Sequence, residues 1–201
     1  MRLMQMAFTF TGLVLSGMAI VGTGSAALAA GAGPLNTPLS AFVGGTGNPA
    51  KLVWIVPGVI KKDNMSTDFL CTSLEAPGVN VDIGVEVFGL DGTQLNKIDG
   101  SITTGVAGPC TTGAVTNVPS GSTVTIGIAG TAQFHEDCII GINAAVGQGS
   151  ARIVSTSSRI SCDAIALDDK HVVVAPNTCS TCQPPTMTSL KVVKPKKQVG
   201  D

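Results

Sequence analysis

Six cysteines and one dense polar cluster are the residues of this sequence best suited to chemistry. The cysteines are Cys71, Cys110, Cys138, Cys162, Cys179 and Cys182. An even number of cysteines in an exported chain favours disulfide bonds, because compartments outside the cytoplasm are oxidising. The polar cluster is His135-Glu136-Asp137, and it holds one of the two histidines of the chain.

The sequence context favours two disulfides in the body of the chain, Cys71–Cys162 and Cys110–Cys138. Cys71 and Cys162 lie in strand-like patterns on faces shared with apolar residues, so we expect their bridge to join two sheets. Cys110 follows Gly-Pro in a loop-like stretch and can reach Cys138 at a strand start. An immunoglobulin-like Cys71–Cys138 bridge stays open, although no tryptophan lies between these two cysteines to pack against it.

The pair Cys179-x-x-Cys182 allows three interpretations: a local disulfide, bridges between chains, or half of a metal site or redox dithiol. Gln183 rather than histidine follows Cys182, which excludes the pattern for covalent haem attachment. No second Cys-x-x-Cys is present to complete a zinc ribbon. We favour the local disulfide.

The cluster His135-Glu136-Asp137 could bind a divalent cation or supply a general base, with Asp168 as a further candidate ligand. Adjacent residues of an extended chain point to opposite faces, so an exposed turn is the favoured interpretation. His171 is expected to be exposed at the start of a tail strand. Neither a Gly-x-Ser-x-Gly nor a Ser-x-x-Lys motif occurs, so no catalytic residue and no cofactor are expected.

Residues 1–29 have the features of a secretory signal peptide. Arg2 precedes an uncharged, largely apolar stretch up to Val21, and Ala27-Leu28-Ala29 fits a cleavage site. Thr, Ser and Gly residues dilute the apolar stretch, so cleavage is favoured over an uncleaved anchor. The chain is therefore expected to be exported to the periplasm, the cell surface or the extracellular space, without a stable membrane span.

Alternating apolar residues predict an all-β domain over residues 51–169. A Gly/Pro-rich lead-in, residues 30–50, precedes it, and an irregular tail with a lysine-rich end, residues 170–201, follows. Val81–Phe88 shows the clearest alternation and is expected to expose one face to solvent. The other expected strands are Lys51–Val56, stopped by Pro57-Gly58, Ser66–Leu74, a strand near Ile98–Thr104, Ser122–Ile128, Cys138–Ile142, Ala151–Ser155 and Arg159–Leu167, with residues 105–121 as a loop.

No stretch after the signal shows a helical apolar period, so we expect a disulfide-stapled antiparallel β-sandwich of the immunoglobulin-like or Greek-key kind. The chain has 12 basic and 13 acidic residues, one tryptophan and no tyrosine. A near-neutral, aromatic-poor chain lacks the footprint that nucleic acid requires. The expected partner is an unknown protein or a second copy.

These observations favour an exported, non-enzymatic structural or binding module that self-assembles through edge strands. Leu39–Val43 and a tail strand over 170–174 are the segments that we expect to mediate the assembly. The alternative is a metal-binding protein or metal-dependent hydrolase that uses His135, Glu136 and Asp137.

Overall fold

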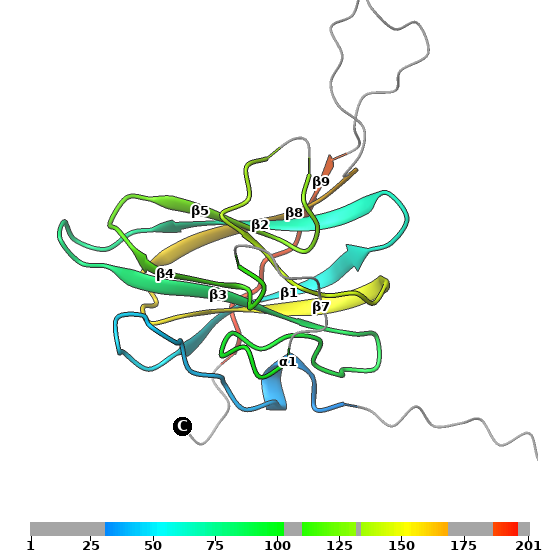
Figure 1. Ribbon diagram of the computed structural model, residues 1–201, viewed down its shortest axis with the longest axis horizontal. Coiled ribbons are helices and arrows are strands. Elements are labelled where there is room, and N and C mark those ends of the chain that lie inside the picture. The colour runs from blue at the N-terminus through cyan, green and yellow to red at the C-terminus, as the bar shows by residue number, and fades with distance from the viewer. Residues whose placement is uncertain (1–30, 103–109, 132–133, 169–186, 197–201) are drawn as a thin grey trace, which may run out of the picture.

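The computed structural model describes residues 31–102, 110–131, 134–168 and 187–196, and it places them in two β-sheets packed face to face (Figure 1). The first sheet has the strand order β1-β7-β3-β4, and the second has the order β6-β5-β2-β8-β9. A single helical turn, α1 (Gly33–Asn36), precedes them. The predicted all-β, sandwich-like architecture is confirmed.

The first sheet is antiparallel throughout. In spatial order its strands are β1 (Lys51–Lys61), β7 (Val146–Ser155), β3 (Val81–Phe88) and β4 (Ala114–Val118). The second sheet is antiparallel except for a short parallel pairing of β6 with β5. Its strands are β6 (Cys138–Ile139), β5 (Thr123–Gly127), β2 (Met65–Ser73), β8 (Ile160–Asp168) and β9 (Met187–Leu190).

The core lies between the two sheets and is built from alternate residues of their strands. Val81, Ile83, Val85 and Val87 all point inward from β3, as the alternation predicts. Phe69 and Cys71 meet them from β2. β-Branched side chains dominate this core, which suits the pleated surface of a sheet.

β1 does not stop at Pro57-Gly58, which the sequence predicted as its end. The strand continues to Lys61, and its register with β7 shifts between Pro57 and Val59. Proline has no N–H to give to a ladder and is tolerated on an edge strand, where β1 lies. Gly58, the extra residue at this shift, takes a φ of 82°, a conformation that glycine adopts without steric cost.

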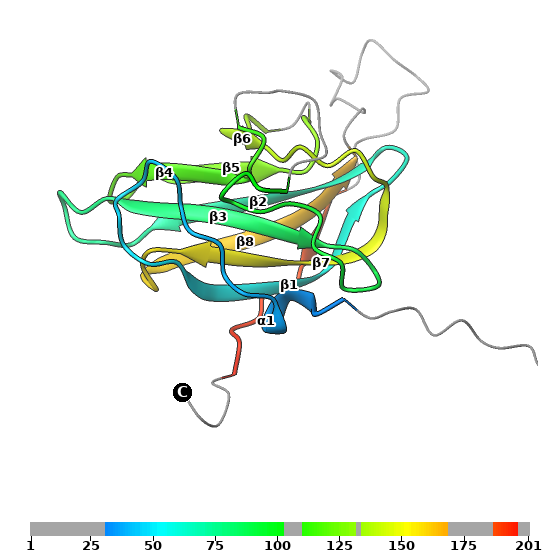
Figure 2. The same ribbon diagram turned by 60° about the horizontal axis from the view of Figure 1, so that its bottom comes forward.

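The outward face of β3 is covered, so the prediction of a half-exposed strand is wrong. All eight residues of β3 are buried. The lead-in residues 31–50 cross this face of the first sheet (blue in Figure 2). Gly84 leaves room for Phe42 of the lead-in and for Ile98. A Cβ at this position would lie 3.1 Å from Phe42 Cε1 and 2.7 Å from Ile98 Cγ2.

Other expected strands differ in extent. Ile98 is buried within a turn in which Lys97 N donates to Ile102 O, so no strand forms over residues 98–102. The stretch predicted as a loop contains β4, in which Val118 belongs to the core and Val115 packs against it. β6 is limited to two residues, whereas β7 begins five residues earlier than predicted.

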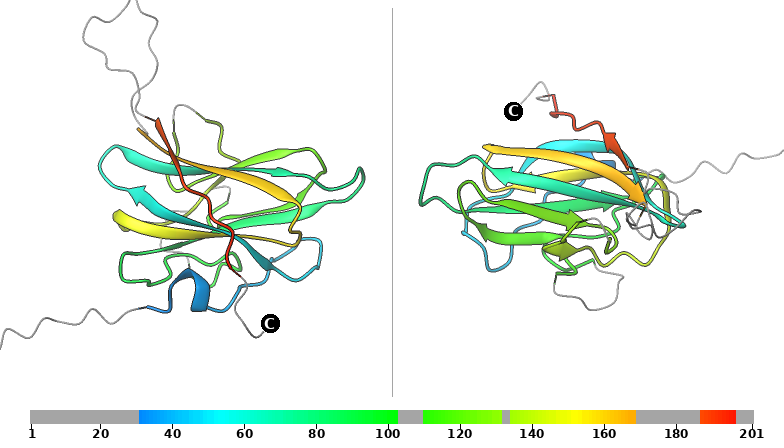
Figure 3. Two further views of the ribbon diagram at one scale, coloured as in Figure 1. Left: turned by 180° about the vertical axis from the view of Figure 1, so that it is seen from behind. Right: turned by 90° about the horizontal axis from the view of Figure 1, so that it is seen from above.

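The C-terminal segment, residues 187–196, crosses the open side of the sandwich and joins the two sheets. β9 pairs with β8 from Leu167 opposite Met187 to Ala164 opposite Leu190. Val193 then exchanges two backbone hydrogen bonds of 2.8 Å with Ile55 of β1. The red segment in the left view of Figure 3 follows this path. The prediction of an irregular tail is therefore wrong for this segment.

Candidate functional site

The Cys71–Cys162 disulfide joins neighbouring strands of one sheet. The register of β2 with β8 places the two cysteines directly opposite each other, with 4.1 Å between their Cα atoms. Because β2 and β8 are hydrogen-bonded neighbours in the second sheet, this bridge lies within one sheet. The favoured pairing is present, but the expectation that it bridges two sheets is wrong.

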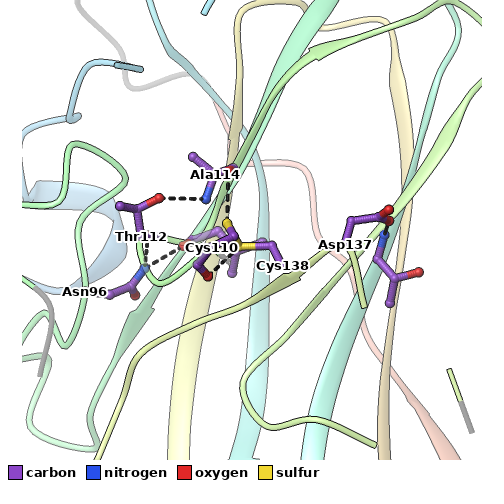
Figure 4. Close-up of a disulfide and its surroundings, with 8 residues drawn as sticks. Asn96, Cys110, Thr112, Ala114, Asp137 and Cys138 are labelled. Atoms are coloured by element: carbon purple, nitrogen blue, oxygen red, sulfur yellow. Dashed lines mark hydrogen bonds between the residues drawn. A yellow bond between two sulfur atoms is a disulfide. The ribbon is translucent and has the colours of Figure 1, made fainter. Parts of the chain in front are cut away.

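The second disulfide, Cys110–Cys138, fixes the loop before β4 to the start of β6 (Figure 4). Buried Asn96 stabilises the same region. Its side-chain amide donates to Val85 O at 2.8 Å and to Thr112 O at 2.9 Å. Its Oδ1 accepts from the backbone N–H of Val87 at 2.7 Å. Every polar atom of this side chain is therefore used in holding the loop against β3.

The structure separates the three residues of the predicted polar cluster. His135 is exposed. Asp137 continues the pairing of β5, since its Oδ2 accepts from Thr125 N at 2.8 Å and its own N–H donates to Thr125 O at 2.9 Å. Glu136 turns instead toward Thr131 and Asp68. Within the described ranges no group of three or more His, Cys, Asp or Glu side chains is arranged to hold a metal ion.

Glu136 meets Asp68 and Thr131, and we call these three residues the acidic latch. Glu136 Oε1 accepts from the backbone N–H of Thr131 at 2.8 Å and from its hydroxyl at 2.6 Å. Thr131 Oγ1 also lies 3.4 Å from Asp68 Oδ2. Asp68 comes from the middle of β2 and has no exposed surface. The buried Asp68 and the partly buried Glu136 thus lie close together.

Burial, and after it the charge of Glu136, raise the pKa of the Asp68 carboxyl to about 7. The Thr131 hydroxyl opposes this shift. A carboxyl with such a pKa changes charge near neutral pH, which ordinary aspartates do not do. The sequence contained one sign of this site: Asp68 is an acidic residue inside the otherwise uncharged strand predicted over Ser66–Leu74.

A buried ion pair on the outer side of the first sheet holds the lead-in. Arg152 of β7 and Glu86 of β3 are 1% and 0% exposed, and Arg152 Nε donates to Glu86 Oε2 at 2.6 Å. The remaining guanidinium N–H groups donate to backbone oxygens of the lead-in: those of Pro34, Thr37 and Pro38. Arg152 therefore links the sheet to the residues that cover it.

Asp82 is the second anchor of the lead-in. Its Oδ2 accepts from the backbone N–H and the hydroxyl of Thr46, both at 2.8 Å. Its Oδ1 accepts from the backbone N–H of Asn117 at 2.9 Å. Gly45 passes so close that a Cβ there would lie 2.4 Å from this carboxylate. The lead-in is thus a packed part of the domain and not a linker.

Two hollows on the surface, of about 410 Å³ and 220 Å³, adjoin each other and share Lys62 and Ala145. Neither of them is lined by His135, Glu136 or Asp137. Of the other candidates, Asp168 ends β8 opposite Met65. The signal peptide, His171, the predicted strand over 170–174, Cys179 and Cys182 lie outside the described residues.

Comparisons with protein families, with curated proteins and with solved structures found no match for this chain. The site must therefore be interpreted from its own geometry. The two disulfides are consistent with an exported protein, because such bonds persist in oxidising compartments. Among the helices of the described residues, none has the length and apolarity needed to cross a bilayer.

Proposed function

We propose that the chain is an exported, non-enzymatic structural or binding module that assembles with copies of itself through a strand edge. The signal-like residues 1–29 and the two disulfides support export. The passage of the chain between the sheets from β1 to β2, and again from β7 to β8, supports an immunoglobulin-like or Greek-key connectivity as the finer fold assignment.

The proposed assembly rests on the outer edge of β9, which is open to pairing with another strand. Sheet edges attract further strands unless bulges, prolines, charges or covering segments protect them. β1 carries Pro57, bulges and the covering contact of Val193. β4 has a register shift against β3 and Asn117 at a φ of 57°. β6 has only two residues.

β9 lacks these protections within its described residues. Its sequence, Met-Thr-Ser-Leu, contains neither proline nor charge, and its first three residues are exposed. Its inner side already pairs with β8, so a strand from a second copy would pair with its outer side. This edge replaces the two segments that the sequence suggested, since residues 39–43 form no strand and residues 170–174 lie outside the described ranges.

Replacing Met187 by lysine is expected to weaken assembly, because a charge on an edge strand opposes the approach of another strand. Met187 is 46% exposed, so the substitution disturbs no core contact. Leu90→Lys is the matched control, since Leu90 is 73% exposed and lies outside every strand. Light scattering after size-exclusion chromatography should show a smaller species for Met187→Lys alone.

A wild-type chain that stays monomeric at every concentration tested would contradict the proposal. Equal assembly of the Met187→Lys and wild-type chains would place the contact elsewhere. The metal-dependent alternative has no supporting contact among the described residues, and we do not propose it.

A further inference from the structure

We propose that Asp68 and Glu136 of the acidic latch share one proton, and that this proton holds the loop between β5 and β6 against β2. Loss of the proton releases the loop. The loop follows Gly127, ends at Cys138 and is described at Ile128–Thr131 and Phe134–Asp137. This device is independent of the strand edge in the proposed function.

One carboxyl oxygen of Asp68 is buried without a hydrogen-bond donor among the described residues. Asp68 has no exposed surface, and its Oδ1 receives no hydrogen bond from any ordinary donor among the described residues. A buried carboxylate oxygen without a donor is costly. The Glu136 carboxyl is within hydrogen-bonding reach of Asp68. A hydrogen bond between two carboxyl groups requires that one of them carry a proton.

The Asp68 and Glu136 side chains approach each other next to Gly127. Gly127 lies opposite Asp68 in the pairing of β2 with β5. A Cβ at residue 127 would lie 2.7 Å from Asp68 Oδ1 and 3.0 Å from Glu136 Cγ. The missing side chain therefore opens the space in which the two carboxyl groups meet.

The surroundings of Asp68 offer no cation within the described residues to neutralise both acids. β5 presents Gly127 and Thr125, and β8 presents Ile165 directly opposite, all without charge. Asp163 lies on the same face of β8, two residues away, but is exposed and negative. On the loop, Asp137 is bound to Thr125 N, and His135 is exposed.

The pKa of about 7 for Asp68 fits this arrangement, because burial and Glu136 both favour its protonated form. The ordinary value of 3.8 applies when the chain is unfolded. A folded pKa above the unfolded one means that the latch stabilises the fold at low pH. This stability is lost as the pH rises from about 4 to about 7.

Above neutral pH the two ionised carboxylates repel each other, and the contacts of Thr131 with Glu136 break. The far end of the loop stays in place, since the Cys110–Cys138 disulfide and the Asp137–Thr125 bonds do not involve the latch. The described residues next to the latch, Ile128–Thr131 and Phe134–Glu136, therefore move away from β2 while the rest of the domain stays folded.

Hydrogen exchange of the full-length, oxidised protein tests the latch between about pH 5 and about pH 9. The probe is the Thr131 amide, which donates to Glu136. We expect its protection, corrected for the intrinsic rate, to fall by up to about tenfold per pH unit from about pH 5 to about pH 7 and to level off at higher pH. Asp68→Asn should keep the loop protected at high pH, because asparagine can donate to Glu136 without a shared proton.

Asp163→Asn is the control, since it removes an exposed carboxylate from the same face and should keep the wild-type pH dependence. Protection that does not change with pH in the wild type would overturn the proposal. An unchanged pH dependence in Asp68→Asn would do the same. If calcium chloride alone restored protection at high pH with one ion bound per chain, a cation and not a proton would be the bridging group.

Discussion

Replacing Arg152 by leucine is expected to lower the free energy of unfolding by about 3–5 kcal/mol. The substitution leaves Glu86 as a buried charge without its partner, and it removes the donors to the backbone oxygens of Pro34, Thr37 and Pro38. The cation–π contact of Arg152 with Phe88, 5.3 Å from the ring centroid, is lost as well. Urea unfolding followed by circular dichroism measures the effect.

Arg159→Leu provides the matched control for this prediction. Arg159 is 64% exposed and lies 3.7 Å from Glu75, so removing this pair should cost no more than about 1 kcal/mol. The combination of Arg152→Leu with Glu86→Leu should cost less than Arg152→Leu alone, because it leaves no buried charge. Equal urea midpoints for Arg152→Leu and Arg159→Leu would show that the buried pair does not anchor the lead-in.

Removal of the Cys71–Cys162 disulfide is expected to have the other large effect, about 4–5 kcal/mol in the chain-entropy description. The reason is the sequence separation of 91 residues, which the bridge constrains in the unfolded chain. The Cys110–Cys138 bridge spans 28 residues, and its loss should cost about 3–4 kcal/mol. Both predictions refer to double alanine variants.

Denaturant unfolding of the two double variants and of the oxidised wild type tests this order. Three of the four cysteines are buried and Cys110 is partly buried against the core. The two double alanine variants should therefore lose similar amounts of packing. A larger loss of stability without Cys110–Cys138 would contradict the entropic explanation. It would indicate that the native contacts around Asn96 and Cys138 depend on their bridge.

The strands themselves could be predicted largely from local alternation. Val81–Phe88 shows how far this reasoning extends: the inward residues are correct, but the burial of Glu86 depends on Arg152, 66 residues later, and on the lead-in. β9 was missed because its short Met-Thr-Ser-Leu sequence has no alternation of its own. It becomes a strand only because β8 provides a hydrogen-bonding edge.

The candidate site could be predicted only in part for the same reason. The sequence drew attention to Glu136, but through its neighbours His135 and Asp137, which point elsewhere. Its real partner, Asp68, is 68 residues away, and their contact requires the register of β2 with β5 and the absence of a side chain at Gly127. Contacts of this kind are set by tertiary pairing, which spacing along the chain does not encode.

The path of residues 187–196 sets the order in which the fold can be completed. β8 and β1 are both made before the segment that joins them, since a polypeptide emerges from its amino terminus onward. In a nascent chain, Ile55 and Ala164–Leu167 therefore lack their backbone partners until residues 187–193 are available. Deletion of residues 187–196 should for this reason yield chains that aggregate through their exposed strand edges rather than a shorter version of the native fold.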